Sequence, residues 1–238
     1  MTDWTIGVVV PANDEAEHIG PCLTALHRSL KAIEHPGRRH HTVVVADACR
    51  DRTVRVARTA LAGWGEVVEV EVRSAGAARG IGVERLLEHL ATSPRDRLWL
   101  ASTDADTVVP VDWLIRQLEL ADAGAVATAG VVAVDTFDGH PAHVRDRFLT
   151  GYDGPPDEAH PHVHGANLGV RGDAYLAVGG WLPLAVGEDR ELWRALRDRG
   201  FATASSRSLT VTTSGRAAGR ARGGFADFLS ALHVPESA

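Results

Sequence analysis

Short apolar runs alternate with segments of helical periodicity through the first half of the sequence, and this alternation limits the possible folds more than any other feature. Residues 6–10, 42–46 and 98–102 are strand-like runs, and alternating valines predict another strand at 68–72. Between them, apolar residues recur at helical spacing, as they do across 19–33. Because a helix between two strands forms a parallel crossover, this pattern predicts an α/β domain with a mostly parallel, twisted sheet flanked by helices.

The second half of the sequence is less regular. Apolar residues predict strands at 125–134 and 208–213, and the spacing at 173–178 and 189–199 predicts helices. Residues 135–164 hold five of the twelve histidines and four prolines without a clear period. Such a long stretch inside a domain favours a functional loop or lid. No repeat or linker divides the sequence, so we expect one domain.

Charge and cysteine content narrow the classes of partner. The 238 residues carry a formal net charge of −6, which argues against general nucleic-acid binding but leaves room for a small basic nucleotide pocket. Cys22 and Cys49 give no disulfide framework and no metal-ligand spacing. The N-terminus lacks a signal-peptide pattern, and the longest apolar run, 124–134, is shorter than the roughly 20 residues of a membrane span. We expect a soluble, cytoplasmic protein without a transmembrane segment.

Two aspartates separated by one small residue, Asp104 and Asp106, follow the strand predicted at 98–102. In open α/β sheets, ligands bind beyond the carboxyl ends of the strands. Paired carboxylates at such a place can share Mg²⁺ or Mn²⁺, which prefer oxygen ligands and keep positions open for substrate phosphates. The alternative is a pair of solvated turn residues. The position after a strand, with a second acidic pair further along, favours a metal site.

Glu15 and Asp47 also follow predicted strands. Their carboxylates can accept hydrogen bonds from a base N–H or a ribose hydroxyl. Alternatively, both are acids that the dipole of a following helix favours. Asn13 or Asp14 is placed to cap the first of these helices.

Glu188 and Asp189 stand at the start of the helix predicted at 189–199. An ionised carboxylate in this position can act as a general base. A role as an N-cap or first-turn acid fits the sequence as well, and it is compatible with catalysis.

Six segments match, in order and spacing, the motifs of a known enzyme family: VVVPANDEAEHI, VVVADACRDRTVRVA, AGAARGIG, STDADTVVP, HGANLGVRGDAYLAVGGW and GEDRELWRAL. Over about residues 6–199, the chain resembles family 2 glycosyltransferases of the GT-A fold. The resemblance implies a single GT-A domain over 1–238. Within it, 1–110 forms a nucleotide-binding half, 111–214 an acceptor-binding half and 215–238 an Arg/Gly-containing tail.

The resemblance implies a metal-dependent enzyme with a nucleotide-diphosphate sugar as donor. Asp104 and Asp106 look like the DXD motif that binds Mn²⁺ or Mg²⁺, with Asp106 the more direct ligand. Glu15 and Asp47 motivate a uridine-linked donor. One departure is that Asn13 and the residue after it stand where the family often has an aromatic residue and then Asn. The positions that match donor-binding motifs are Pro11, Ala12, Asn13, Glu15, Asp47, Arg79, Asp104, Ala105 and Asp106.

Asp189 matches the acid that deprotonates the acceptor hydroxyl in inverting members of the family. The Gln-x-x-Arg-Trp signature of processive polysaccharide synthases is absent. The resemblance therefore implies a hexosyltransferase-type enzyme that moves a single sugar, with inversion, to a hydroxyl of a small or lipid-linked acceptor. The sugar, the acceptor and the oligomeric state stay open. The positions that match the acceptor side are His164, Gly165, Asn167, Trp181 and Glu188.

Several alternatives compete with this interpretation. A non-catalytic nucleotide-sugar-binding member would be expected to lose the acids that this chain retains. Residues 104–108 also fit the signature of haloacid-dehalogenase-like phosphatases, but their nucleophile follows the first strand, and Lys31, the only lysine, lies upstream. A Rossmann dehydrogenase needs a glycine-rich loop after the first strand, where this sequence has no glycine. His160, His162 and His164 alternate and could bind zinc, although the lack of nearby cysteines favours a polar active-site loop.

Overall fold

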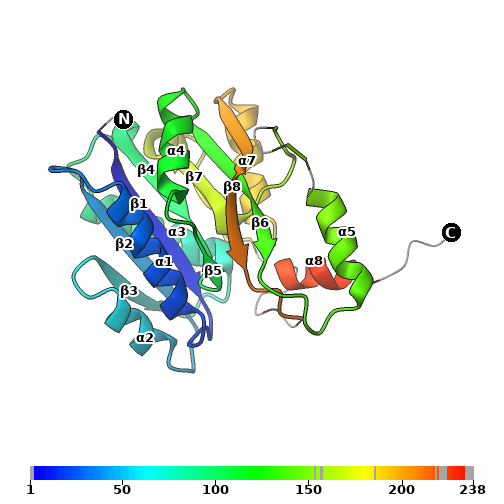
Figure 1. The fold of residues 1–238 in the computed structure, drawn as a ribbon. Helices are drawn as coiled ribbons and strands as arrows, with labels where there is room; N and C mark the ends of the chain where they lie inside the picture. The colour runs from blue at the N-terminus through cyan, green and yellow to red at the C-terminus, as the bar shows by residue number, and fades with distance from the viewer. Residues whose placement is uncertain are drawn as a thin grey trace.

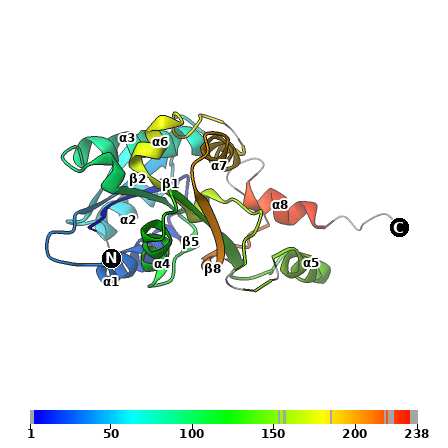
Figure 2. The same cartoon turned by 90° about the horizontal axis from the view of Figure 1, so that it is seen from above.

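One twisted sheet runs through the molecule and carries helices on both faces (Figure 1, Figure 2). The computed structural model describes residues 3–152, 154–155, 158–184, 186–217, 219 and 224–233. Within these residues the sheet has eight strands, in the order β3-β2-β1-β4-β7-β6-β8-β5. The strands are β1 (Thr5–Ala12), β2 (His40–Asp47), β3 (Gly65–Val70), β4 (Leu98–Ser102), β5 (Thr107–Val108), β6 (Ala127–Val134), β7 (Leu168–Arg171) and β8 (Thr203–Thr213).

Parallel pairing dominates the half of the sheet built from the N-terminal residues. There β1 pairs with β2 and β4, and β2 pairs with β3, all in parallel. In the other half, β7 runs antiparallel to both β4 and β6, β8 is parallel to β6, and β5 is antiparallel to β8. The prediction of a mostly parallel α/β sheet flanked by helices is confirmed.

Helices cover the two faces in separate groups (Figure 2), with α1, α2 and α4 on one face and α3, α6 and α7 on the other. Helices α5 and α8 lie side by side beyond the strands β6 and β8 (Figure 1). Two short 3₁₀ turns are η1 (Arg95–Arg97) and η2 (Gly165–Asn167). The α-helices are α1 (Ile19–Ala32), α2 (Thr53–Ala60), α3 (Ala75–His89), α4 (Trp113–Asp122), α5 (Ala142–Tyr152), α6 (Gly172–Ala177), α7 (Glu188–Asp198) and α8 (Phe225–Ala231).

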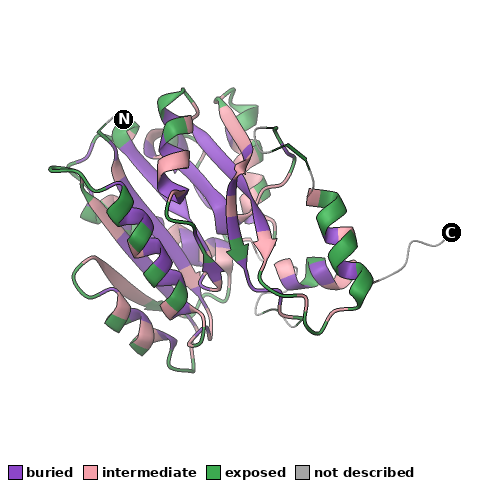
Figure 3. Ribbon diagram, in the orientation of Figure 1, coloured by how far each residue is buried: buried purple, intermediate pink, exposed green. Residues whose placement is uncertain are grey.

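The central strands are buried on both faces (Figure 3), so they separate two hydrophobic cores. In β1, Val8 and Val10 face the core beneath α1, whereas Val9 faces the core beneath α3. This alternation follows from the two-residue period of a strand. Gly82 lets α3 pack directly on the sheet, because a Cβ there would lie 2.4 Å from Val9 Cγ2.

The prediction of a structureless stretch over 135–164 is wrong, because α5 occupies its middle. Val144 and Phe148 are buried on this helix, and Phe148 stacks on Tyr152 with ring centroids 4.4 Å apart. Phe148 also meets Phe225 of α8 edge to face. The three α5 side chains are spaced four residues apart, which is a helical signal that the surrounding histidines and prolines obscured.

The prediction that Asn13 or Asp14 caps the first helix is also wrong. Helix α1 begins at Ile19, after His18, whose side chain makes no capping bond. Asn13 instead donates to the Asp47 carbonyl oxygen at 2.7 Å, and Asp14 accepts from the Arg50 backbone N–H at 2.6 Å. These side chains tie the loop after β1 to the loop after β2 rather than starting a helix.

The ends of two strands differ from the predicted ones. Strand β3 stops at Val70, because the next backbone amides turn toward the Asp47 carboxylate. Strand β8 begins at Thr203, earlier than the predicted 208–213, since pairing with β6 extends it. Among the residues that the structure describes, no helix reaches the length and apolarity of a bilayer span.

Candidate functional site

The carboxyl ends of β1, β2 and β4 meet at one edge of the sheet, because these neighbouring strands are parallel. Asp47 is the last residue of β2, Glu15 follows β1, and Asp104 and Asp106 follow β4. The fold therefore brings the acids singled out in the sequence to the edge where α/β proteins bind ligands.

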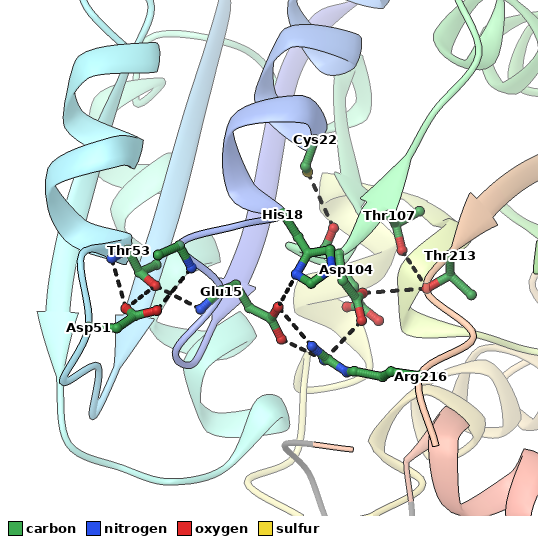
Figure 4. Close-up of polar contacts among 11 residues, drawn as sticks. Glu15, His18, Cys22, Asp51, Thr53, Asp104, Thr107, Thr213 and Arg216 are labelled. Atoms are coloured by element: carbon green, nitrogen blue, oxygen red, sulfur yellow. Dashed lines mark hydrogen bonds and ion pairs between the residues drawn. The ribbon is translucent and has the colours of Figure 1, made fainter. Parts of the chain in front are cut away.

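Glu15 and Asp106 share one cation, the guanidinium of Arg216. Figure 4 shows Arg216 reaching Glu15. Arg216 Nη1 donates to Glu15 Oε2 at 2.9 Å, and Arg216 Nη2 lies 2.9 Å from Asp106 Oδ2. Thr213 Oγ1 is 3.4 Å from the other oxygen of Asp106. Burial and the charge of Asp104 raise the pKa of Asp106 to about 6, although Arg216 opposes the shift. The site thus concentrates negative charge and attracts cations.

Arg79 is buried at the centre of the site, with 3% of its surface exposed. Its Nε donates to Ser102 Oγ at 3.1 Å, and its two Nη groups donate to Asp104 and to Glu188. The guanidinium also lies over the ring of Trp181, 5.2 Å from the centroid. Burial raises the pKa of Glu188, against the opposing effect of Arg79. Three of its five N–H donors have partners here, through which Arg79 links the Asp104 loop to the start of α7, and its contact with the donor stays a prediction.

Asp47 accepts three hydrogen bonds from the backbone that leads into α3. Its Oδ1 accepts from the Val72 and Arg73 amides at 2.8 Å each, and its Oδ2 accepts from the Ser74 amide at 2.9 Å. A carboxylate offers about four acceptor positions, so a base can use at most one more. Asp47 therefore holds the loop after β3 in place, a role that the sequence did not indicate.

We expect Asp47→Ala to lower the free energy of unfolding by about 2–4 kcal/mol, because three backbone amides lose a charged acceptor in a largely buried place. Urea denaturation measures the change, with an unchanged slope against urea showing that compactness is preserved. Asp198→Ala is a matched control, because this acid forms an exposed ion pair with Arg194, so its loss should change stability by about 0.5 kcal/mol or less. A loss for Asp47→Ala no larger than the control's would show that these hydrogen bonds do not stabilise the loop.

Asp189 lies in the first turn of α7 and faces the segment before β7. Its Oδ2 accepts from the Gly165 amide at 3.0 Å, and its Oδ1 accepts from the Arg190 amide at 2.7 Å. Gly165 packs against Arg79, because a Cβ at this glycine would lie 2.5 Å from Arg79 Nη2. Asp189, Gly165 and the Arg79 network are therefore neighbours, which sequence separation alone did not reveal.

His164 precedes Gly165, and its Nε2 shares a hydrogen bond of 2.8 Å with the Tyr152 hydroxyl. Burial lowers the pKa of His164 to about 4, so its ring is neutral at pH 7. Sequence reasoning missed Tyr152, although its spacing from Val144 and Phe148 marks it as part of a helix face. The neutral ring and the hydroxyl can accept or donate hydrogen bonds beside Asp189.

The rings of His160, His162 and His164 stack in sequence, with centroid separations of 5.8 and 6.2 Å. Within the described part of the chain, no group of three or more His, Cys, Asp or Glu is placed to hold a metal ion. The zinc alternative for these histidines therefore finds no support in the residues that the structure describes.

Asn167 does not line the acceptor side, contrary to the sequence-based expectation. Its side chain is 1% exposed, and its carbonyl oxygen accepts from Trp113 Nε1 at 2.8 Å. Its amide donates to the carbonyl oxygens of Val131 and Leu209 at 2.9 and 2.8 Å. The pairing of β6 with β8 shifts register just before Val131, so Asn167 completes hydrogen bonding at this irregularity. Its role is structural.

The remaining predicted residues shape the site through their backbone or their small size. Ala12 and Ala105 are buried, and Pro11 is half-buried at the end of β1. Ala105 packs in the core below α1, which lets its two acidic neighbours turn toward the site edge. Trp181 is buried against Arg79. Of the C-terminal arginines, Arg220 and Arg222 lie outside the described residues.

The acids that follow β4 fit a divalent cation. Asp104 and Asp106 supply hard oxygen donors, and a guanidinium already stands as a cation against Asp106. Two protein carboxylates suffice where waters and substrate phosphates complete the coordination, as they commonly do for Mg²⁺.

Comparison with known families assigns the chain to a family of enzymes. A model of the family described as glycosyltransferase-like family 2 matches residues 4–221. The chain belongs to this family. Among curated proteins, none matches it closely enough to count as a relative.

Solved structures share the fold at low sequence identity. The S. aureus TarS fragment 1–349 in complex with UDP-GlcNAc gives a TM-score of 0.65 at 12% identity, over 91% of this chain and 60% of that one. The mannosyltransferase PcManGT from Pyrobaculum calidifontis, in complex with GDP-Man and Mn²⁺, gives a TM-score of 0.66 at 20% identity. The match covers 92% of this chain and 59% of that one. A mycobacterial protein gives a TM-score of 0.56 at 18% identity, over 97% of this chain and 71% of that one. The likeness confirms the GT-A fold, and the chain spans about 60% of the length of the TarS fragment.

Proposed function

We propose that the protein is a metal-dependent glycosyltransferase that moves a single sugar from a nucleotide-diphosphate sugar, uridine-linked, to a hydroxyl of a small or lipid-linked acceptor, with inversion. The observation that carries the proposal is the convergence of Asp104, Asp106 and Asp189. Arg79 links two parts of this group, with ion pairs to Asp104 and to Glu188, the neighbour of Asp189. We assign Asp104 and Asp106 to a metal and the separate carboxylate of Asp189 to an acceptor.

Two structural neighbours support the choice of ligands. TarS is described in complex with UDP-GlcNAc, and PcManGT in complex with GDP-Man and Mn²⁺. Both ligands are sugars linked to a nucleoside diphosphate, and the second structure includes a divalent metal. A donor of this kind suits a site whose acids follow the parallel strands of residues 1–110.

The chemistry divides between two sets of residues. Asp104 and Asp106 would hold Mn²⁺ or Mg²⁺, which when bound neutralises charge on the departing diphosphate. Asp189 takes the proton from the acceptor hydroxyl while the oxygen of that hydroxyl bonds to the anomeric carbon. At the same time, the bond from the anomeric carbon to the diphosphate oxygen breaks. Attack from the face opposite the diphosphate inverts the configuration. Gly165 N–H orients the Asp189 carboxylate through its hydrogen bond of 3.0 Å.

Calorimetry with UDP, UMP, GDP, dTDP and ADP, with and without Mn²⁺, tests the donor assignment. We expect UDP to bind at least about tenfold more tightly than UMP, and only with Mn²⁺, because a metal held by Asp104 and Asp106 would offset the charge of the diphosphate. A preference for UDP over GDP and ADP would support the uridine assignment. Binding of all four diphosphates with equal affinity and without metal, or of none, would contradict the proposed function.

A further inference from the structure

Arg216 follows the end of β8 and reaches two acids, Asp106 and Glu15, that are about one hundred and two hundred residues away in the sequence. One guanidinium group contacts both oxygens of Glu15 and Oδ2 of Asp106. The side chains of Glu15 and Asp106 are 5% and 15% exposed, whereas that of Arg216 is 24% exposed. Arg216 is therefore the more accessible partner and covers two largely buried carboxylates.

This ion pair offsets charge that the site would otherwise hold uncompensated. Arg79 pairs with Asp104, and Arg216 pairs with Asp106. Buried carboxylates are costly unless a cation and hydrogen bonds compensate them. Arg216 thus supplies at Asp106 the positive charge that a divalent metal supplies in a loaded site.

A metal ion at Asp106 competes with Arg216 for the same carboxylate. Mg²⁺ binds carboxylate oxygens at about 2.0–2.1 Å, and Arg216 Nη2 already lies 2.9 Å from Asp106 Oδ2. Two cations on one carboxylate repel each other, so metal binding weakens the contact of the guanidinium with Asp106 and favours its turning away. The backbone before it can stay fixed, because the Gly215 amide donates to Asp135 at 2.8 Å and the Gly215 carbonyl oxygen lies 2.7 Å from His140 Nε2.

We propose that Arg216 is the resident counter-ion of the metal-binding carboxylates and that, once a metal displaces it from Asp106, it binds the diphosphate of the donor. This proposal rests on the function proposed above. A guanidinium presents paired N–H groups that match a phosphate as they match the Glu15 carboxylate. When metal binds alone, Arg216 loses its contact with Asp106 and gains no other anion. When metal and diphosphate bind together, the diphosphate becomes the new anionic partner of Arg216. Metal and nucleotide therefore bind cooperatively, each raising the affinity for the other.

The test begins with Mn²⁺ alone, titrated into the full chain and followed by electron paramagnetic resonance. Arg216→Gln removes the competing cation, so it should bind Mn²⁺ about tenfold more tightly than the unmodified protein. With saturating Mn²⁺, the same variant should bind UDP about tenfold or more weakly, because the diphosphate loses its guanidinium. Arg55→Gln on α2 removes an equal charge from an exposed position and should change neither affinity.

Arg216→Lys separates charge from geometry, and it serves also if the Gln variant does not fold. It should keep the weak Mn²⁺ affinity of the unmodified protein but lose UDP affinity, because an ammonium cannot make the paired contact. Unchanged or weaker Mn²⁺ binding in Arg216→Gln overturns the counter-ion role, and unchanged UDP binding overturns the diphosphate role. If the unmodified protein binds no nucleotide diphosphate with Mn²⁺, the proposed function fails, while the Mn²⁺ comparison still decides the counter-ion role.

Discussion

Asp189→Asn should lower the rate of sugar transfer by about 10²–10⁴-fold, the usual contribution of a positioned general base. Asparagine keeps the size of the side chain and can still accept the hydrogen bond from the Gly165 amide, but it cannot take a proton. Donor affinity should stay within about twofold, because Asp189 lies on α7, whereas the carboxylates proposed to hold the metal follow β4. Transfer assays and donor calorimetry on the same preparation separate the two effects.

Asp198→Asn provides a matched control at the other end of α7, where the side chain forms an exposed ion pair with Arg194. It should transfer sugar at the unmodified rate. Normal transfer by Asp189→Asn would instead reduce Asp189 to a helix-start acid. The base would then have to be Glu188 or one of the histidines at 160–164.

Asp106→Asn should weaken metal-dependent binding of the donor by about 100-fold or more, since even loss of an outer-shell partner can cost that much. The variant removes the negative charge that would hold the metal in the proposed site, while Thr213 can still hydrogen-bond the side chain. Asp104→Asn should have a smaller effect, because Arg79 already occupies one oxygen of Asp104.

Calorimetry of UDP in saturating Mn²⁺ measures both variants. Thermal unfolding without ligand should show that Asp106→Asn keeps the fold, since relief of charge repulsion among buried acids offsets the lost ion pair with Arg216. Full donor affinity in Asp106→Asn would remove this residue from the metal site.

The order of the strands and helices in the first half could be predicted because each element carries its own period. Strands β1, β2 and β4 are continuous apolar runs, as expected for strands buried on both faces. The parallel pairing then follows from the crossover helices. Helix α5 was missed because its stability depends on tertiary contacts, above all those of Phe148 with Tyr152 and with Phe225 of α8.

The acidic residues of the candidate site could also be found from the sequence, since position after a strand indicates the ligand-binding edge. The hydrogen-bond partners of these residues could not be found from the sequence. Asp47 is engaged by three backbone amides and Asn167 by strands β6 and β8, and neither contact has a local sequence signal. The same holds for the ion pair of Arg216 with Glu15, which joins residues 201 positions apart.

The central claim is that a divalent metal and a nucleotide diphosphate bind as one unit at Asp106, and thermal unfolding with each ligand alone and with both tests it most directly. UDP and Mn²⁺ together, with UDP at 100 times its Kd, should raise the stability of the protein by about 2.7 kcal/mol. Either ligand alone should raise it far less, and Asp106→Asn should lose the joint effect. Equal stability in every condition, across UDP, GDP, dTDP, ADP and their sugar conjugates, would contradict the account.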